Sequence, residues 1–351
     1  ITIKQSKNLE FDVNKFLTQQ INIKNNVQIQ VALFECEGKT ALCMVSNHMC
    51  MDGGDFKYFL ATLCKNYTKL CLNNQNMEIK HGSRSYEVVY SGLSDEDKKI
   101  AGTLFKNVSQ TKDKHRFPLT AKSPDDTNRI VKHILPKEKF EVMRLAGKAK
   151  GHTVNDIMLA CYFQSLFELA GYEKDATVTI PCMIDLRRHM KEGGAESGLT
   201  NHTGFMTCTI HGIGATVAET LLKVEESIKD EKADKFIGLY SLPLLHLAYQ
   251  VFPHFFSEFC IKLGYNNPLV GMSNVGVIVP ETYVLNNLTP YDGFFTGAVK
   301  HKPFMQVALT TMNGNVTFTI AVCGTAKDEA IIQKFFTIFD KNVDVLIKSN
   351  L

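Results

Sequence analysis

The residues best suited to chemistry in this chain are His48 and Asp52, which stand four positions apart and are followed by two glycines. Alternating apolar residues lead up to His48, and from Phe56 onward apolar residues recur at helical spacing. This pattern predicts a strand that ends near His48, a turn at residues 52–54 and a helix after the turn. A neutral imidazole at such a strand end can take a proton from an alcohol, amine or thiol as that group attacks an electrophile.

The sequence His48-x-x-x-Asp52-Gly53 resembles the active-site motif of the CoA-dependent acyltransferase superfamily. That superfamily includes chloramphenicol acetyltransferase, the condensation domains of peptide synthetases and alcohol acyltransferases. The resemblance implies that His48 is the general base for acyl transfer from a thioester, without an acyl-enzyme. It also implies that Asp52 points away from the substrate and holds the turn, while Gly53 leaves room for the turn or the substrate channel. Gly54 is interpreted as a helix-cap residue without a steric role.

The resemblance further implies an arginine partner for Asp52, which argues against a triad in which Asp52 orients His48. The candidate is Arg187, because residues 184–187 resemble the strand-end Asp-x-Arg element of the superfamily. A bidentate contact with a carboxylate suits arginine better than lysine, and loss of one partner from a buried pair costs on the order of 3–5 kcal/mol. The alternative is that Arg187 faces solvent in a loop.

Three more polar residues are candidates for the oxyanion site or the tunnel wall. Ser273 and Asn274 belong to a sequence, Ser-Asn-Val-Gly, that resembles an element near the tunnel of this superfamily. Asn201 resembles a Gly-Asn region of the family, although Thr200 stands where the glycine is expected. Preorganised donors of this kind contribute about 10²–10³ in rate. Each residue also fits an ordinary turn or cap.

Two residues beside His48 bear on competing interpretations. Cys50 invites a Cys-His nucleophile or a metal site with His48 and Asp52, but zinc needs a further ligand and no partner motif is present. We therefore expect no metal. Asn47 stands where many family members have a second histidine, which argues against a typical peptide-synthetase condensation domain.

The composition is that of a globular protein without a strong charge bias. Of its 351 residues, 44% are hydrophobic, and 39 basic against 36 acidic residues give a net charge of +3. We expect no nucleic-acid partner and no transmembrane segment, because the longest apolar stretch, residues 239–263, contains prolines and charges. The ten cysteines form no C-x-x-C pair, which is typical of a reducing compartment and predicts a cytoplasmic protein.

Interleaved strands and helices predict an α/β (α+β) fold. The predicted elements include a hairpin of residues 27–34 and 40–46, a second hairpin with its turn at Asn313-Gly314, helices capped by Thr153 and Thr325, and an interrupted helix over residues 239–263. A polar stretch with two prolines suggests a linker over residues 118–128, between an N-terminal lobe (1–117) and a C-terminal lobe (129–351). The resemblance implies two chloramphenicol-acetyltransferase-like lobes, each a mixed sheet flanked by helices, with a tunnel between them. Only 47 residues precede His48, fewer than the family usually has, so we expect that part of the family's N-terminal segment lies outside this sequence or that this lobe is trimmed.

Together these observations predict an acyltransferase for groups other than aminoacyl groups. Its co-substrate would be acyl-CoA or a phosphopantetheinyl thioester, its acceptor a small-molecule hydroxyl or amine, and no permanently bound cofactor is expected. One alternative is a carrier-protein-dependent condensation enzyme of the non-ribosomal peptide or polyketide type, with an acyl carrier protein as partner. A second alternative is a non-catalytic, condensation-like binding protein.

Overall fold

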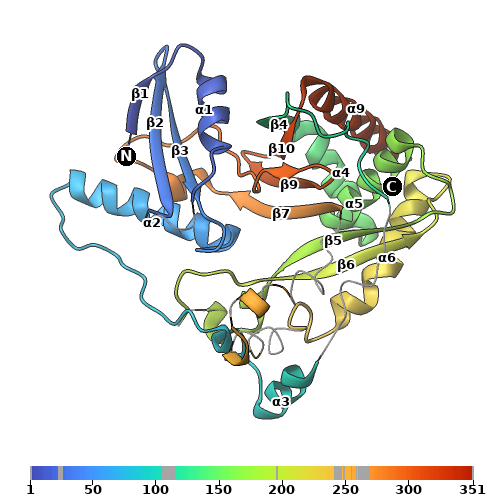
Figure 1. The fold of residues 1–351 in the computed structure, drawn as a ribbon, viewed down its shortest axis with the longest axis horizontal. Coiled ribbons are helices and arrows are strands. Elements are labelled where there is room, and N and C mark those ends of the chain that lie inside the picture. The colour runs from blue at the N-terminus through green and yellow to red at the C-terminus, as the bar shows by residue number, and fades with distance from the viewer. Residues whose placement is uncertain are drawn as a thin grey trace.

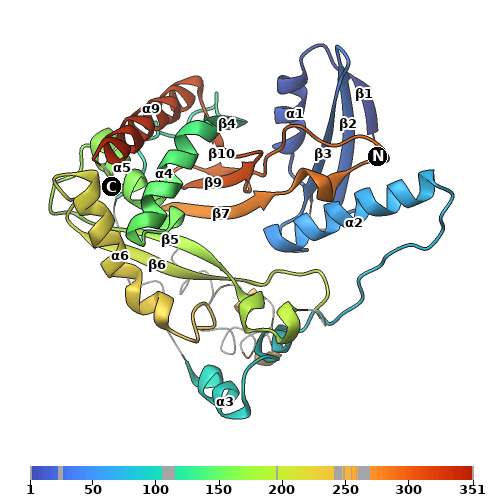
Figure 2. The same ribbon diagram turned by 180° about the vertical axis from the view of Figure 1, so that it is seen from behind.

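The computed structural model describes residues 2–22, 27–104, 115–194, 197–240, 247, 250–253, 255–257, 259 and 269–349. Two β-sheets flanked by helices make up a mixed α/β fold (Figure 1 and Figure 2), as the sequence predicts. The predicted helical stretch at residues 239–263 lies mostly outside the described residues. No helix in the described part of the chain combines the length and apolar character that crossing a bilayer requires.

The smaller sheet has three strands and carries the turn that contains His48. Strand β1 (Thr2–Gln5) pairs in parallel with β2 (Ile29–Cys36), and β2 forms the predicted hairpin with β3 (Lys39–Ser46). Helix α1 (Leu9–Leu17) packs on this sheet, and α2 (Gly53–Cys71) begins just after the turn (Figure 1). The strand and helix expected on either side of His48 are therefore present.

The larger sheet has seven strands, and its main path follows the order β4-β10-β9-β7-β5-β6. Strand β7 is parallel to both of its neighbours, β9 and β5, whereas β4, β10, β9 and the β5–β6 pair are antiparallel. The short strand β8 pairs with the end of β10. The strands are β4 (Thr127–Leu135), β5 (Thr177–Asp185), β6 (Thr203–His211), β7 (Val270–Ile278), β8 (Lys300–His301), β9 (Met305–Met312) and β10 (Asn315–Gly324).

Four helices pack against the larger sheet and bury the main hydrophobic core. They are α4 (Lys137–Lys150), α5 (Val154–Ala170), α6 (Val217–Ala233) and α9 (Ala326–Lys348) (Figure 2). The predicted caps are present: the Thr153 and Thr325 side chains accept hydrogen bonds from the backbone N–H groups of Asp156 and Asp328. The predicted Asn313-Gly314 turn joins β9 to β10 with both residues at positive φ, 52° and 84°.

Side chains from neighbouring helices bind backbone groups at both edges of the larger sheet, on one residue of β4 and two residues of β6. On β4, Ile130 exchanges two hydrogen bonds with the Asn14 amide of α1, at 3.1 and 3.3 Å. On β6, the backbone N–H of Thr207 donates to Glu231, and that of Thr209 donates to Ser227, both at 2.9 Å. The Asn14 contact also attaches the smaller sheet's helix to the larger sheet.

A smaller hydrophobic cluster joins residues 89–90, 186–190 and 236–239 to Ala101 of α3 (Asp95–Thr103), the helix at the bottom of Figure 1. Because β4 begins at Thr127, the last two residues of the predicted linker belong to the larger sheet. The division into lobes at residues 117 and 129 stays a prediction. The short 3₁₀ segments are η1 (Tyr86–Tyr90), η3 (Leu186–His189), η4 (Lys191–Gly193) and η5 (Pro280–Tyr283).

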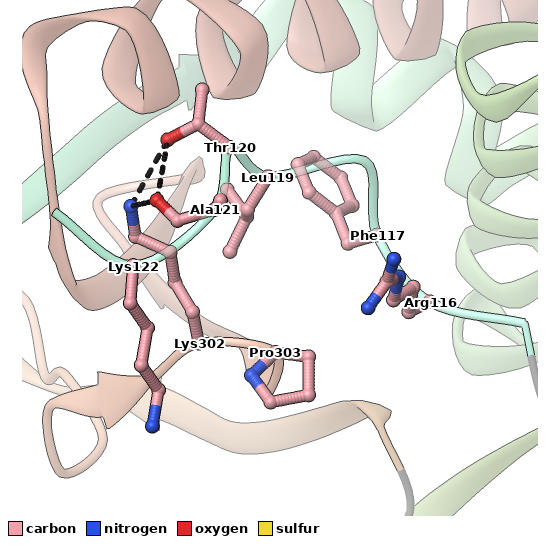
Figure 3. Close-up of a pocket in the computed structure, with 8 residues that line it drawn as sticks. All are labelled: Arg116, Phe117, Leu119, Thr120, Ala121, Lys122, Lys302 and Pro303. Carbon is pink, nitrogen blue, oxygen red and sulfur yellow. Dashed lines mark hydrogen bonds between the residues drawn. The ribbon is translucent and has the colours of Figure 1, made fainter.

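A pocket of about 270 Å³ is lined in part by Thr120 and Lys302 (Figure 3), whose side chains contact Asp328 in the first turn of α9. Beside it, Lys302 is only 5% exposed and pairs with Asp328 at 2.9 Å and with Asp126 at 2.7 Å. Its ammonium group also donates to the Thr120 hydroxyl and to the Ala121 carbonyl (Figure 3). Eight residues line the cavity: Arg116, Phe117, Leu119, Thr120, Ala121, Lys122, Lys302 and Pro303.

Candidate active site

His48 lies two residues beyond the end of β3, and its side chain is exposed. Its Nδ1 atom is 3.1 Å from Oδ1 of Asn201, a residue just before β6. The amide nitrogen of Asn201 donates to the backbone carbonyl of His48. Asn201 was expected at the oxyanion site or the tunnel wall, and the structure places it directly against the candidate base.

Asp52 is buried, at 3% exposed, and caps the start of α2. One of its oxygens accepts the backbone N–H of Asp55 at 2.9 Å, and the other accepts that of His202 at 2.7 Å. Nη2 of Arg187 lies 3.0 and 3.1 Å from the two oxygens. The expected contact between Asp52 and Arg187 is therefore present, but one guanidinium nitrogen makes it, not a two-nitrogen fork.

The carboxylate of Asp55 is a member of this cluster that the sequence reasoning missed. It is 2% exposed, and one of its oxygens lies 2.9 Å from Nη2 of Arg187 and 2.8 Å from the backbone nitrogen of Thr200. Burial raises the pKa of Asp55, but its contacts with His202, Thr200 and Arg187 outweigh burial and lower it. In the sequence, Asp55 has the position of an ordinary helix-capping acid, three residues after the cap. Only its burial in the structure identifies it as a partner of Arg187.

Arg187 is the cation at the centre of this cluster, and Lys80 lies 4.0 Å from the other oxygen of Asp55. Its Nη1 atom binds Asp185 at 2.9 Å, while Nη2 faces both buried aspartates. Burial opposes the charge on Arg187, but the contacts with Asp52, Asp55 and Asp185 together raise its pKa. The alternative of a solvent-facing loop residue is wrong, because the Arg187 side chain is only 16% exposed.

His202 is a second residue that sequence reasoning missed. It is 1% exposed, and its Nδ1 atom lies 3.2 Å from Nη2 of Arg187. Its Nε2 atom has no hydrogen-bond partner within the described residues. Nothing in its local sequence signals this placement, because the residues it meets are at least fifteen positions away.

The two glycines after Asp52 differ in the space around them. A Cβ on Gly54 would lie 3.0 Å from Nη1 of Arg187 and 3.3 Å from Oδ1 of Asp52, whereas one on Gly53 would make an ordinary 3.4 Å contact with Val275. The interpretation of Gly54 as a residue without a steric role is therefore wrong. Gly54 leaves the room that the arginine occupies.

Ser273 and Asn274 lie on β7 beside an irregularity in its pairing with β9. The side-chain oxygen of Asn274, an exposed residue, accepts the Gly276 N–H at 2.9 Å, and Ser273 is half-buried. Lys57 of α2 donates to the Val275 carbonyl at 2.7 Å, and burial is the main cause that lowers the pKa of Lys57. This bond attaches the helix that follows the His48 turn to the strand of the two oxyanion candidates, whose roles stay predictions.

Cys50 is half-buried, and its backbone carbonyl accepts a hydrogen bond from Arg84 at 3.3 Å. Among the described residues, no group of three or more histidine, cysteine, aspartate or glutamate side chains is arranged to hold a metal ion. The acidic side chains near His48 instead converge on Arg187.

Comparisons with family models and with curated proteins find no match to the sequence. Solved structures do match the fold. TRI3, a trichothecene 15-O-acetyltransferase from Fusarium sporotrichioides, has a TM-score of 0.66 at 13% identity, over 97% of this chain and 76% of TRI3.

Two domains of peptide synthetases are similar as well. The epimerization domain of the third module of tyrocidine synthetase B has a TM-score of 0.62 at 13% identity, over 99% of this chain and 80% of that domain. The first condensation domain of the CDA synthetase has a TM-score of 0.56 at 14% identity, over 91% of this chain and 67% of that one. The chain therefore shares its fold with an acetyltransferase and with two peptide-synthetase domains, in agreement with the fold that the motif implied.

Proposed function

We propose that this protein is an acyltransferase in which His48 is the general base. The observation that carries the proposal is the contrast between the two motif residues: the imidazole of His48 is exposed, whereas Asp52 is buried against Arg187. His48 is thus the motif residue that a substrate can reach. Asp52, through its bonds to Asp55, His202 and Arg187, would fix the turn that follows His48.

The proposed reaction joins acceptor and donor in one ternary complex. The imidazole of His48 takes the proton of the acceptor's hydroxyl or amine while that group forms a bond to the thioester carbonyl carbon. The tetrahedral intermediate then collapses, the carbon–sulfur bond breaks, and His48 returns the proton to the leaving thiolate. Proximity in a tunnel between the two sheets would supply much of the rate, with Ser273 and Asn274 as candidate donors to the oxyanion.

Acyl-CoA is the proposed donor, since the acetyltransferase TRI3 shares this fold. The alternative donor is a phosphopantetheinyl thioester on an acyl carrier protein, because a condensation domain also shares this fold. A non-catalytic binding protein is the third possibility, but an exposed histidine with a dedicated side-chain partner favours catalysis.

A thermal-shift titration against CoA and acyl-CoAs of increasing chain length tests the donor. A ligand at 100 times its Kd stabilises the folded protein by about 2.7 kcal/mol, which raises the Tm measurably. We expect a shift that depends on chain length. A shift with none of these ligands would move the proposal to a carrier-protein donor.

Replacement of His48 tests the base. With an acyl-CoA donor and a panel of alcohols and amines, release of free CoA thiol should fall to background in His48→Gln while the Tm stays near that of the wild type. His301→Gln, at an exposed histidine on β8, is the matched control and should keep full activity. Full activity in His48→Gln would refute the mechanism.

A further inference from the structure

Asn201 belongs to a three-residue segment, Thr200–His202, that is bonded on both sides to the turn and the start of α2. The Thr200 carbonyl accepts the Asp52 N–H at 3.3 Å, and the Thr200 N–H donates to Asp55 at 2.8 Å. The His202 N–H donates to Asp52 at 2.7 Å. The backbone of Asn201 is therefore held in one place relative to His48, so its side chain meets the imidazole in a defined way.

The orientation of the Asn201 amide follows from its two partners. A backbone carbonyl can only accept hydrogen bonds, so the group that faces the His48 carbonyl must be the amide nitrogen of Asn201. The amide oxygen then faces Nδ1 of His48 at 3.1 Å. Because that oxygen has no proton to give, Nδ1 must carry the proton of this hydrogen bond.

This contact leaves the other ring nitrogen, Nε2, without a proton whenever His48 is neutral. We propose that Asn201 is a positioning residue that keeps the proton of neutral His48 on Nδ1 and so presents Nε2 as the base. The assignment of the base rests on the proposed function, whereas the position of the proton is a property of the resting protein.

A neutral amide suits this task differently from a carboxylate. An aspartate beside Nδ1 would also bind the Nδ1 proton, but its charge would favour the protonated imidazole, which cannot accept another proton. Asp52 does not take this role, because Arg187, His202 and Asp55 already bind its two oxygens. Asn201 therefore selects the tautomer of His48 without adding negative charge beside it.

Nitrogen-15 NMR of the imidazole side chains tests this proposal on the 351-residue chain without any substrate. The chain has 11 histidines, and the signals of His48 are those that disappear in His48→Gln. We expect neutral His48 in the wild type to carry its proton on Nδ1. In Asn201→Ala, the proton should move predominantly to Nε2, which is the preferred position in a free histidine side chain.

Asn201→Asp is the second variant and has a different expected signature. It keeps an oxygen that can accept the Nδ1 proton, although it loses the bond to the His48 carbonyl, so the tautomer should stay as in the wild type. Its charge should move the protonation midpoint of His48 to higher pH, and the acid limb of the kcat/KM profile should move with it. A residue that only supported the fold would change neither signal.

If acyl transfer is detected, Asn201→Ala should lower kcat by about 10- to 100-fold with little change in KM, as removal of an orienting partner commonly does. Neutral His48 with its proton on Nε2 in the wild type, or on Nδ1 in Asn201→Ala, would overturn the proposal whatever the activity. The expected tautomers in a protein that transfers no acyl group would instead leave the inference standing and count against the proposed function.

Discussion

Asp52 and Asp55, one helical turn apart at the start of α2, share a single nitrogen atom of Arg187. Nη2 of the arginine lies 3.0 Å from Oδ1 of Asp52 and 2.9 Å from Oδ2 of Asp55, and both carboxylates are almost fully buried. Arg187 is therefore the nearest cation to both acids, with Lys80 4.0 Å from the other oxygen of Asp55, whereas Arg187 itself has a third partner in Asp185. This unequal dependence decides which substitution in the cluster costs most.

We expect Arg187→Met to destabilise the protein more than Asp52→Asn. Loss of the arginine leaves two buried carboxylates without their main counter-ion and should cost about 3–5 kcal/mol, measured by urea unfolding. Asp52→Asn leaves Arg187 with Asp55 and Asp185, and the asparagine can still cap α2. Arg84→Met, at an exposed arginine, is the control. An equal cost for Asp52→Asn would contradict the shared-cation account.

Gly54→Ala should lower both stability and any activity that depends on His48. The new methyl group would press on a guanidinium that three carboxylates hold in place, so the arginine cannot easily move aside. Gly102→Ala in α3 is the matched control, because a Cβ there meets nothing within 4 Å. The control should be neutral or stabilise by about 0.5–1 kcal/mol, as alanine does in helices. Similar unfolding midpoints for both variants would show that Gly54 has no steric role.

Stability should fall in mildly acidic solution because of His189. Burial is the main cause that lowers the pKa of this histidine, whose Nε2–H group donates to the Ile237 carbonyl at 2.8 Å. The unfolded chain therefore binds a proton here at higher pH than the folded chain does. The contribution of neutral His189 to the free energy of unfolding is therefore fully present above about pH 6.5, and it is lost as the pH falls below that value.

Thermal unfolding between pH 7.5 and 5 measures this effect. The decline in Tm should be shallower in His189→Gln, whose amide can still donate to the Ile237 carbonyl, than in the wild type. His301→Gln, at an exposed histidine, should keep the wild-type slope. A slope in His189→Gln equal to that of the wild type would exclude His189 as the cause.

Lys302→Met should lower the Tm much more than Lys235→Met. Distance alone would suggest the opposite, because Lys235 lies 2.6 Å from Asp97, whereas Lys302 lies 2.9 Å from Asp328. Asp328 is fully buried, and loss of Lys302 leaves its charge without a counter-ion, whereas the Lys235 side chain is 61% exposed. Differential scanning calorimetry at neutral pH compares the two variants. Equal losses would mean that burial does not govern these ion pairs.

Short-range patterns in the sequence were sufficient to predict the parts of the fold that depend on neighbouring residues. The β2–β3 hairpin, the helix after the His48 turn and the Asn313-Gly314 turn are examples, because alternation, helical spacing and turn chemistry act within a few residues. Strand β1 was not predicted, since it is short, exposed on every residue and stabilised by pairing with β2.

The candidate site could be predicted only where a residue belonged to a motif. His48, Asp52 and Arg187 did, and the structure brings the last two together. Asp55 and His202 did not, because their importance comes from burial and from partners far along the chain: Asp55 meets Arg187 132 positions later, and His202 meets Asp52 150 positions earlier. Such partners are determined by the topology of the two sheets, which no local pattern reveals.

The hydrogen bonds at the edges of the larger sheet also have a consequence for association between molecules. An open edge strand presents unpaired backbone groups to which a strand of a second molecule can add. For this to happen at β6, Glu231 and Ser227 would first have to release the backbone of Thr207 and Thr209, and at β4, Asn14 would have to release Ile130. At these three residues the helices beside the sheet thus oppose the addition of a further strand.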